Sequence, residues 1–214
     1  MRVKICGLMR KIDLEAALNG GADAVGFVVG TPSARRNLRL EKASKLMKTV
    51  PPLTSKVAVT TASNLKTLQR ISETLRPDAL QVHRYDMKTI RTLRKKNPQL
   101  KIILSTPIRD RQSISQAERG VKSSDAIHAD SASESGRGGT GKTHDWKLTA
   151  ELRRHIHPHP LILAGGLNPN NVHLAIKTVR PYAVDVSSGV ETVIGIKDHR
   201  KIMMFIKNAK EAPK

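Results

Sequence analysis

The sequence predicts an α/β protein in which eight strands alternate with eight helices and close into a (βα)8 TIM barrel. Short apolar runs alternate with longer amphipathic stretches along all 214 residues. Strands that are separated by helices pair in parallel. Eight strand–helix units of about 27 residues each fit the lower end of the length range of this barrel. A doubly wound open sheet is the alternative architecture.

The predicted strands are short aliphatic runs. Aromatic residues make up only 2% of the chain, so the core must be built from Val, Ile, Leu, Ala and Met. Small interdigitating side chains of this kind suit a closed sheet wrapped by helices. We expect strands at 3–6, 24–29, 56–60, 79–82, 101–105, 126–130, 161–164 and 183–187.

The predicted helices occupy the amphipathic stretches between the strands. The segment 64–75 has its apolar residues on one helical face, at Leu65, Leu68, Ile71 and Leu75. Asn64 is a suitable N-cap for this helix, and Pro51-Pro52 ends the preceding one. We expect helices near 12–20, 41–49, 64–75, 86–97, 113–119, 146–156, 170–179 and 198–208.

The chain reads as a single domain, 1–214, because no Pro/Gly/Ser linker divides it. The Ser/Gly-rich stretch 131–143 lies between a strand and a helix and is typical of a long loop. No signal peptide and no apolar run long enough for a membrane span is recognisable. A lone cysteine excludes an internal disulfide framework and fits a reducing compartment. We therefore expect a cytoplasmic protein.

The strong positive charge constrains the possible partners. The 38 Lys and Arg residues outnumber the 18 Asp and Glu residues, which gives a net charge of +20. Such a charge can mark a nucleic-acid binder or steer an anionic metabolite towards the protein. The basic residues are spread along the whole chain, with almost no aromatic residues for base stacking. We expect a small anionic ligand and no dedicated nucleic-acid partner.

Residues at the carboxyl ends of the strands are the candidates for function, because barrel enzymes build their sites there. Gly165-Gly166 and Ser188-Gly189 follow the last two strands, where barrels commonly bind phosphate. Ser188 to Glu191 fits the short extra helix whose N-terminus favours an anion. The positions selected by this rule are Cys6, Arg35, Arg36, Gln81, His83, Asp130, Gly165, Gly166, Asp185 and Ser187.

Cys6 and Asp130 are the candidates for acid–base chemistry. Cys6 ends the first strand, and its thiolate can act as a base where neighbouring positive charge lowers its pKa. Asp130 ends the sixth strand, and a carboxyl whose pKa is raised in a partly closed site can act as an acid. The alternatives are structural: Cys6 is a buried core cysteine, and Asp130 is an N-cap or turn residue.

Two further motifs have less weight. The segment 136–143 matches the phosphate-binding pattern G-x-x-x-x-G-K-[ST], but it does not directly follow its strand and lacks a matching downstream magnesium site. A Gly-rich loop that closes over an anionic ligand is the better interpretation. The histidine-rich segment 155–159 lies before a strand, at the opposite barrel end, and favours a solvated loop over a metal site.

Six segments in order make the chain resemble the phosphoribosylanthranilate isomerase family of tryptophan biosynthesis, in an archaeal-like form. They are Lys4-Ile5-Cys6-Gly7, 21–27, Gln81-Val82-His83, Asp130 with 138–146, Ala164-Gly165-Gly166-Leu167, and 184–191. The resemblance implies a cofactor-free, metal-free Amadori rearrangement of N-(5-phosphoribosyl)anthranilate to 1-(2-carboxyphenylamino)-1-deoxyribulose 5-phosphate. It implies an isomerase that is a monomer or homodimer.

The resemblance also assigns roles to residues. Cys6 would be the base and Asp130 the acid, while Arg36, or Arg35 in its place, would bind the anthranilate carboxylate. Asp185 would accept from the bridging amine, with Gln81 and His83 also lining the substrate site. The phosphate would bind at Gly139, Gly141, Gly165, Gly166, Ser188 and Gly189.

This sequence departs from the family pattern in three places: the sixth loop, Arg84 and the segment before Arg36. The rivals are another phosphate-binding barrel enzyme of the same pathway and a basic nucleic-acid-binding protein.

Overall fold

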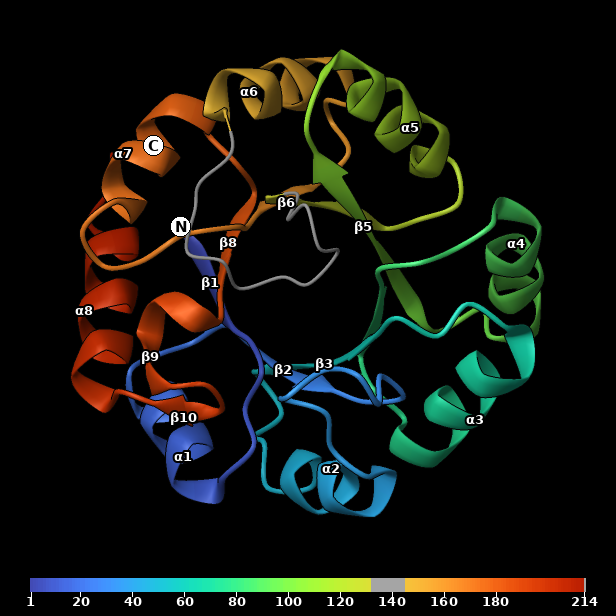
Figure 1. Ribbon diagram of the computed structural model, residues 1–214, viewed down its shortest axis with the longest axis horizontal. Coiled ribbons are helices and arrows are strands. Elements are labelled where there is room, and N and C mark those ends of the chain that lie inside the picture. Colours follow the sequence, from blue (N-terminus) through green and yellow to red (C-terminus); the bar gives the residue numbers. More distant parts are fainter. Residues whose placement is uncertain (132–144, 214) are drawn as a thin grey trace.

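The computed structural model describes residues 1–131 and 145–213, and it is a closed barrel of eight parallel strands surrounded by helices (Figure 1). Each strand pairs with the next one along the chain, and β1 pairs with β8 to close the ring. The predicted (βα)8 fold is confirmed, and the open-sheet alternative is wrong because that pairing leaves the sheet without an edge.

The strands lie close to their predicted positions. β5 is longer than expected, and β7 is shorter. The barrel strands are β1 (Arg2–Ile5), β2 (Ala24–Val28), β3 (Ser55–Thr60), β4 (Ala79–Val82), β5 (Lys101–Ile108), β6 (Ala126–Ser131), β7 (Leu161–Leu163) and β8 (Ala183–Val186).

The helices also follow the predicted order. They are α1 (Lys11–Asn19), α2 (Leu40–Met47), α3 (Leu65–Leu75), α4 (Met87–Lys96), α5 (Arg111–Val121), α6 (Trp146–His155), α7 (Val172–Val179) and α8 (His199–Lys210). Between β8 and α8 lie a short 3-10 helix, η1 (Ser188–Val190), and a hairpin of β9 (Glu191–Val193) and β10 (Ile196–Lys197). The hairpin was not predicted, because its strands are too short to show periodicity.

Side-chain caps explain where several helices begin. The side chain of Asn64 accepts a hydrogen bond from the Thr67 backbone N–H at 2.9 Å, as predicted. Asp86, Asp110, Asp145 and Asp198 cap α4, α5, α6 and α8 in the same way. Such caps satisfy N–H groups that have no partner within the helix.

Alternation along the strands divides the core into two layers. One face of each strand packs outward on the helices, where Phe27 and Phe205 are fully buried. The inward faces form a smaller cluster made of Cys6, Val57, Val59, Ala79, Ile103, Ala126, Ile162 and Ala183. Together with buried polar side chains, this cluster fills the barrel interior, as is usual for the fold.

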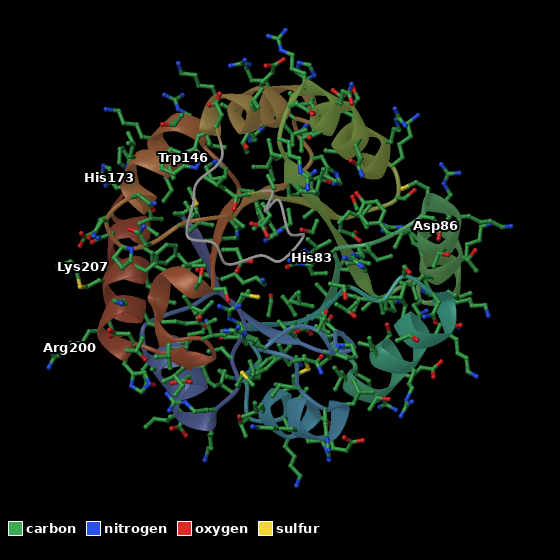
Figure 2. The ribbon with its side chains drawn as sticks, in the orientation of Figure 1. His83, Asp86, Trp146, His173, Arg200 and Lys207 are labelled. Atoms are coloured by element: carbon green, nitrogen blue, oxygen red, sulfur yellow. The ribbon has the colours of Figure 1, made fainter. Side chains whose placement is uncertain are left out.

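Charged side chains cover the outside of the helix ring, as Arg200 and Lys207 show, whereas His83 lies inside it (Figure 2). Among the described residues, no helix combines the length and the apolar character that a membrane crossing requires.

Candidate active site

A layer of buried polar side chains lies in the barrel directly beneath the mouth. Lys4 on β1 donates to Asp185 Oδ2 on β8 at 2.8 Å, and His128 Nε2 on β6 contacts the same oxygen at 2.9 Å. His128 Nδ1 lies 2.9 Å from Ser105 Oγ on β5. Because an ionised carboxylate only accepts, Nε2 of His128 carries the proton towards Asp185. Four strands are thus linked at one height.

The positions of Cys6 and Asp130 follow from this layer. Cys6 comes two residues after Lys4, directly beyond the end of β1, and Asp130 comes two residues after His128 on β6. Since side chains alternate and strands rise by about 3.3 Å per residue, both point inward one layer nearer the mouth. The charges of Lys4 and Asp185 influence the pKa values of both residues. The two predicted acid–base residues therefore lie at the same end of the barrel, around the same Lys4–Asp185 pair.

The electrostatics of the site keep Asp185 ionised. Burial acts to raise the pKa of Asp185, but Lys4 and His128 together hold it below its ordinary value. Its second oxygen, Oδ1, is buried and has no hydrogen-bond partner among the described residues. A buried carboxylate oxygen without a donor has a strong capacity to accept one.

Burial raises the pKa values of both acid–base candidates. Burial raises the pKa of the Cys6 thiol, and Lys4 only partly opposes this effect. The predicted thiolate depends on cations that lower the pKa of Cys6. In the free protein this pKa is raised instead. The carboxyl of Asp130, which is half-buried, also has a raised pKa because of burial. A raised pKa suits an acid but leaves Cys6 mainly a thiol at neutral pH.

Gly26 on β2 makes room for Cys6. A Cβ atom at this position would lie 2.8 Å from Cys6 Sγ, 3.2 Å from Cys6 Cα and 3.2 Å from Lys4 Cε. These separations are shorter than an ordinary carbon–carbon separation of about 3.5 Å. The thiol thus occupies the space that a side chain would take on the neighbouring strand.

Gln81 in β4 and His83 directly after it form another wall of the candidate site. The Gln81 amide donates to His83 Nε2 at 3.0 Å, and the His83 ring meets His128 edge-on with 5.8 Å between centroids. Burial, followed by the nearby His128 and Lys4, lowers the pKa of His83 to about 3. His83 is therefore neutral, and its Nδ1 carries the proton.

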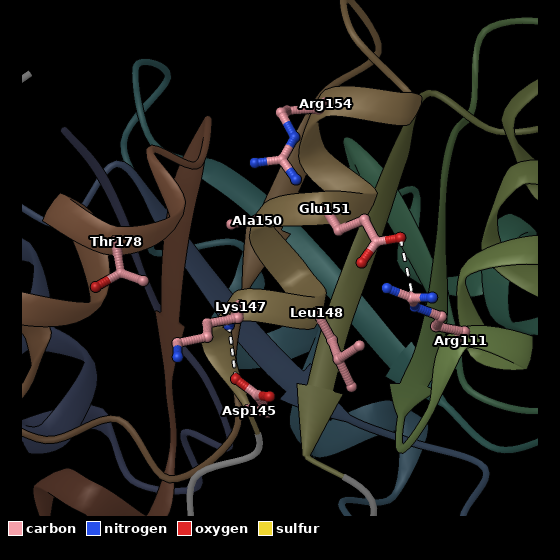
Figure 3. A pocket seen from close by; sticks show the side chains of 8 residues that line it. All are labelled: Arg111, Asp145, Lys147, Leu148, Ala150, Glu151, Arg154 and Thr178. Carbon is pink, nitrogen blue, oxygen red and sulfur yellow. Dashed lines mark hydrogen bonds and ion pairs between the residues drawn. The ribbon is translucent and has the colours of Figure 1, made fainter.

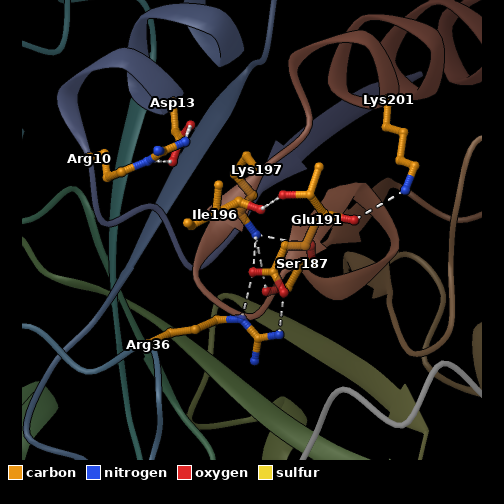
Figure 4. Close-up of polar contacts among 9 residues, drawn as sticks. Arg10, Asp13, Arg36, Ser187, Glu191, Ile196, Lys197 and Lys201 are labelled. Atoms are coloured by element: carbon orange, nitrogen blue, oxygen red, sulfur yellow. Dashed lines mark hydrogen bonds and ion pairs between the residues drawn. The ribbon is translucent and has the colours of Figure 1, made fainter.

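Arg36 reaches the mouth from the loop after β2 and pairs with Glu191 (Figure 4). The guanidinium Nε and Nη2 donate to the two carboxylate oxygens at 2.8 and 2.6 Å. Lys197 donates to the same carboxylate at 2.9 Å. Arg35 is exposed and makes no such contact with a described residue. Of the two candidate arginines, only Arg36 is held in place.

The end of β6 and the loops after β7 and β8 meet at the predicted phosphate site. Gly165 and Gly166 have φ values of +82° and +66°, which favour glycine. A Cβ at Gly165 would collide with the Ser131 backbone N, and one at Gly189 with the Leu167 carbonyl oxygen. The short helix predicted after β8 is confirmed as η1, which begins at Ser188. Gly139, Gly141 and the P-loop-like segment lie outside the described residues.

The histidine-rich segment lies at the opposite end of the barrel, as expected. His155 contacts Glu118 at 2.7 Å, and His159 contacts Ser124 at 3.3 Å. An acidic partner therefore accompanies His155, which the sequence did not indicate. Within residues 1–131 and 145–213, no group of three or more His, Cys, Asp or Glu side chains is placed to hold a metal ion.

A hollow of about 430 Å³ on the outside of the barrel is lined by none of the predicted site residues (Figure 3). Its lining is Arg111, Asp145, Lys147, Leu148, Ala150, Glu151, Arg154 and Thr178, on the outer helices. The exposed Arg111 and the partly buried Glu151 form an ion pair at 3.8 Å in this lining. We assign it no part in the chemistry.

Sequence reasoning selected Asp185 but missed the other members of the polar layer, Lys4, Ser105 and His128. Lys4 and His128 each lie two residues before a predicted acid–base residue, so a polar residue on the same strand face as a candidate was the available signal. Glu191 and Lys197 gave no such signal, because the hairpin that pairs them was not recognised.

Comparison with known proteins identifies the family. The model of the N-(5'-phosphoribosyl)anthranilate (PRA) isomerase family matches residues 3–208. The chain belongs to the PRA isomerase family. An isomerase of this name from Methanothrix thermoacetophila is 44% identical over 210 residues, which cover 98% of each chain.

Solved structures agree with this assignment. The PRA isomerase of Thermotoga maritima has a TM-score of 0.88 and 35% identity, with 98% of both chains covered. A further structure, with a TM-score of 0.84, 33% identity and 98% of both chains covered, is a PRA isomerase in complex with reduced 1-(o-carboxyphenylamino)-1-deoxyribulose 5-phosphate. The activity is that of a PRA isomerase in tryptophan biosynthesis, which excludes the neighbouring pathway enzyme as an interpretation.

Proposed function

We propose that Cys6 is the general base and Asp130 the general acid of the PRA isomerase reaction in this chain. The supporting observation is that Lys4, Asp185 and His128 link β1, β8 and β6 at one height, with Cys6 and Asp130 one layer above. An acid and a base that face one hollow suffice for an Amadori rearrangement.

The reaction balances without a cofactor. Asp130 donates its proton to the furanose ring oxygen, and the bond from that oxygen to C1′ breaks as the amine nitrogen forms a double bond to C1′. The iminium acidifies the C2′ hydrogen, which Cys6 removes as a proton. The electron pair left on C2′ neutralises the iminium to give an enolamine. This tautomerises to the product ketone, 1-(2-carboxyphenylamino)-1-deoxyribulose 5-phosphate.

The protonation states support these roles. A raised pKa keeps a larger fraction of Asp130 protonated, as an acid requires. Cys6 must lose its proton, and Lys4 and Lys197 are the cations that favour its thiolate against the effect of burial. The base is therefore present in only a small fraction of the free protein and has high proton affinity in that form.

The contacts of the mouth support a binding pose. The phosphate binds at Gly165, Gly166, Ser188 and Gly189, where loops and the start of η1 present backbone N–H groups, with Gly139 and Gly141 contributed by the sixth loop. Arg36 binds the anthranilate carboxylate. Asp185 accepts from the bridging amine through Oδ1, the oxygen that lacks a partner among the described residues. Gln81 and His83 line the remaining wall.

The proposal also covers the cellular location and the partners of the enzyme. We propose a cytoplasmic enzyme that acts on a small phosphorylated substrate as a monomer or homodimer, without a dedicated nucleic-acid partner. Electrostatic attraction of an anionic substrate is one use for its positive charge.

The proposal is tested by following PRA consumption by fluorescence in wild type, Cys6→Ser and Asp130→Asn. General acid–base residues typically contribute about 10²- to 10⁴-fold, so each variant should lose at least about a hundredfold in kcat. Circular dichroism and binding of the reduced product should remain close to wild type. Near-normal turnover in both variants would remove the assigned roles and leave the family assignment intact.

A further inference from the structure

We propose that Glu191, braced by Lys197, is a positioning residue that holds Arg36 in the orientation needed to recognise the aromatic carboxylate of the substrate. The inference rests on the proposed role of Arg36. It assigns carboxylate selectivity to a residue that does not itself touch the substrate.

Glu191 accepts hydrogen bonds from one edge of the Arg36 guanidinium. Nε and Nη2 of Arg36 both donate to it, in the parallel two-bond arrangement that fixes the plane of an arginine (Figure 4). The side chains of Arg36 and Glu191 are only 16% and 5% exposed. No described residue accepts from Nη1. The end formed by Nη1 and the second hydrogen of Nη2 is therefore available to another carboxylate.

Lys197 fixes Glu191 in turn. The antiparallel register of β9 and β10 pairs Lys197 with Glu191. The Lys197 ammonium is fully buried and donates to Glu191 Oε1 and to the Ser187 carbonyl oxygen, both at 2.9 Å. Lys201 holds the Glu191 backbone carbonyl at 3.1 Å. The carboxylate thus has a fixed position before any ligand arrives.

The stem of Arg36 passes beside the proposed base. Gly7, directly after Cys6, has φ +74°, and a Cβ there would lie 2.7 Å from Arg36 Cδ and 2.9 Å from Ser187 Oγ. The absence of a side chain at Gly7 lets Arg36 lie across the end of β1. A carboxylate bound to the free end of Arg36 would therefore be anchored close to Cys6.

The charges of the cluster suit an anionic ligand. Glu191 is one anion between two cations, Arg36 and Lys197, which leaves a net charge of +1. Burial acts to raise the pKa of Glu191, but Arg36 and Lys197 hold it below its ordinary value, so the carboxylate stays ionised. Without Glu191, the guanidinium would regain rotational freedom that a ligand would have to remove on binding.

The test compares two ligands that differ by one carboxylate. They are reduced 1-(o-carboxyphenylamino)-1-deoxyribulose 5-phosphate and its counterpart with an unsubstituted phenyl ring. The ratio of their dissociation constants, measured by calorimetry, reports carboxylate recognition alone. Charge-assisted hydrogen bonds of about 1.5–3 kcal/mol predict a ratio of about 10 to 100 in wild type.

The variants are Arg36→Met, Glu191→Gln and Arg36→Lys. Arg36→Met should reduce the ratio to near 1. Glu191→Gln keeps Arg36 but loses one of the two acceptors, so the ratio should fall about tenfold while affinity for the phenyl ligand stays within about twofold. Arg36→Lys keeps the positive charge but lacks the planar pair of donors, so its ratio should also fall to near 1, which separates the geometry of Arg36 from its charge.

Asp125→Asn is the matched control. Asp125 also receives a two-bond arginine contact, from Arg94 at 2.9 and 3.3 Å, but it precedes β6 at the opposite barrel end. This variant should leave the ratio unchanged. A wild-type ratio in Glu191→Gln, together with a lost ratio in Arg36→Met, would overturn the positioning role alone. An unchanged ratio in Arg36→Met would instead overturn the proposed role of Arg36.

Discussion

Replacing Gly26 with alanine should disturb the base without touching the substrate. The added Cβ would approach Cys6 Sγ to 2.8 Å, and Cys6 Cα and Lys4 Cε to 3.2 Å each. These distances fall short of an ordinary separation of about 3.5 Å by about 0.7 Å at the sulfur and about 0.3 Å at the two carbons. Rotation of the Cys6 side chain relieves the first overlap. It leaves the overlap with the Cys6 backbone in place, so β1 and β2 must also separate slightly.

Two opposing terms set the effect on stability. Overpacking typically costs about 1–3 kcal/mol, and alanine in a strand interior recovers about 0.5–1 kcal/mol relative to glycine. The free energy of unfolding should therefore fall by about 1 kcal/mol, and the barrel should persist. Because a 1 Å misplacement of a reacting group costs about a hundredfold, kcat should fall about ten- to a hundredfold.

The assay is steady-state PRA consumption together with urea unfolding, with Gly120→Ala as the control. A Cβ at Gly120 would meet only the side-chain ends of Leu104 and Ile127, at 3.1 and 3.3 Å, in the outer layer. The control variant should keep the wild-type kcat. A Gly26→Ala protein with unchanged kcat and a folded barrel would refute the idea that the space at Gly26 places the thiol.

Further predictions concern pH and stability. In the residual activity of Asp130→Asn, kcat/KM should rise about tenfold per pH unit from pH 6 to 9, because only the thiolate of Cys6 then limits it and its pKa is raised. In the wild type, kcat/KM should be nearly constant over this pH range, because the fraction of protonated acid falls as the fraction of ionised base rises. A constant kcat/KM in Asp130→Asn would contradict the role of Cys6 as the base. Asp13→Asn should lower the free energy of unfolding by about 1–3 kcal/mol in urea, because the buried Asp13 carboxylate accepts from Arg10 at 2.8 and 2.6 Å and from His199 at 2.9 Å. Burial acts to raise the pKa of Asp13, but these donors lower it overall. The contribution of Asp13 to the free energy of unfolding is therefore complete above about pH 4 and is lost as pH falls through the folded-state pKa. Equal pH dependence of the free energy of unfolding in wild type and Asp13→Asn would contradict this.

The sequence predicted the barrel and the mouth residues because both leave local signals. Apolar runs mark the strands, and Cys6 and Asp130 are recognisable where such runs end. The contacts within the polar layer left a weaker signal. Alternation shows that Lys4 faces the same side as Cys6, but the heights at which β1, β6 and β8 meet depend on the stagger of the closed sheet.

The partner of Arg36 was also beyond local reasoning. Arg36 and Glu191 are 155 residues apart, and a two-residue strand such as β10 is too short for any periodic pattern. The pKa of Cys6 was open for a related reason. Its direction depends on how far burial outweighs Lys4 and Lys197, which requires coordinates.

The bond between Lys4 and Asp185 spans 181 positions of the chain. During synthesis, the lysine leaves the ribosome long before the carboxylate that neutralises it. A buried ammonium is costly without its partner, so we expect Lys4 to become buried only when β8 supplies Asp185. The last strand therefore completes the electrostatics and the ring in one event, and a chain that stops short of it has neither a closed sheet nor a functional mouth.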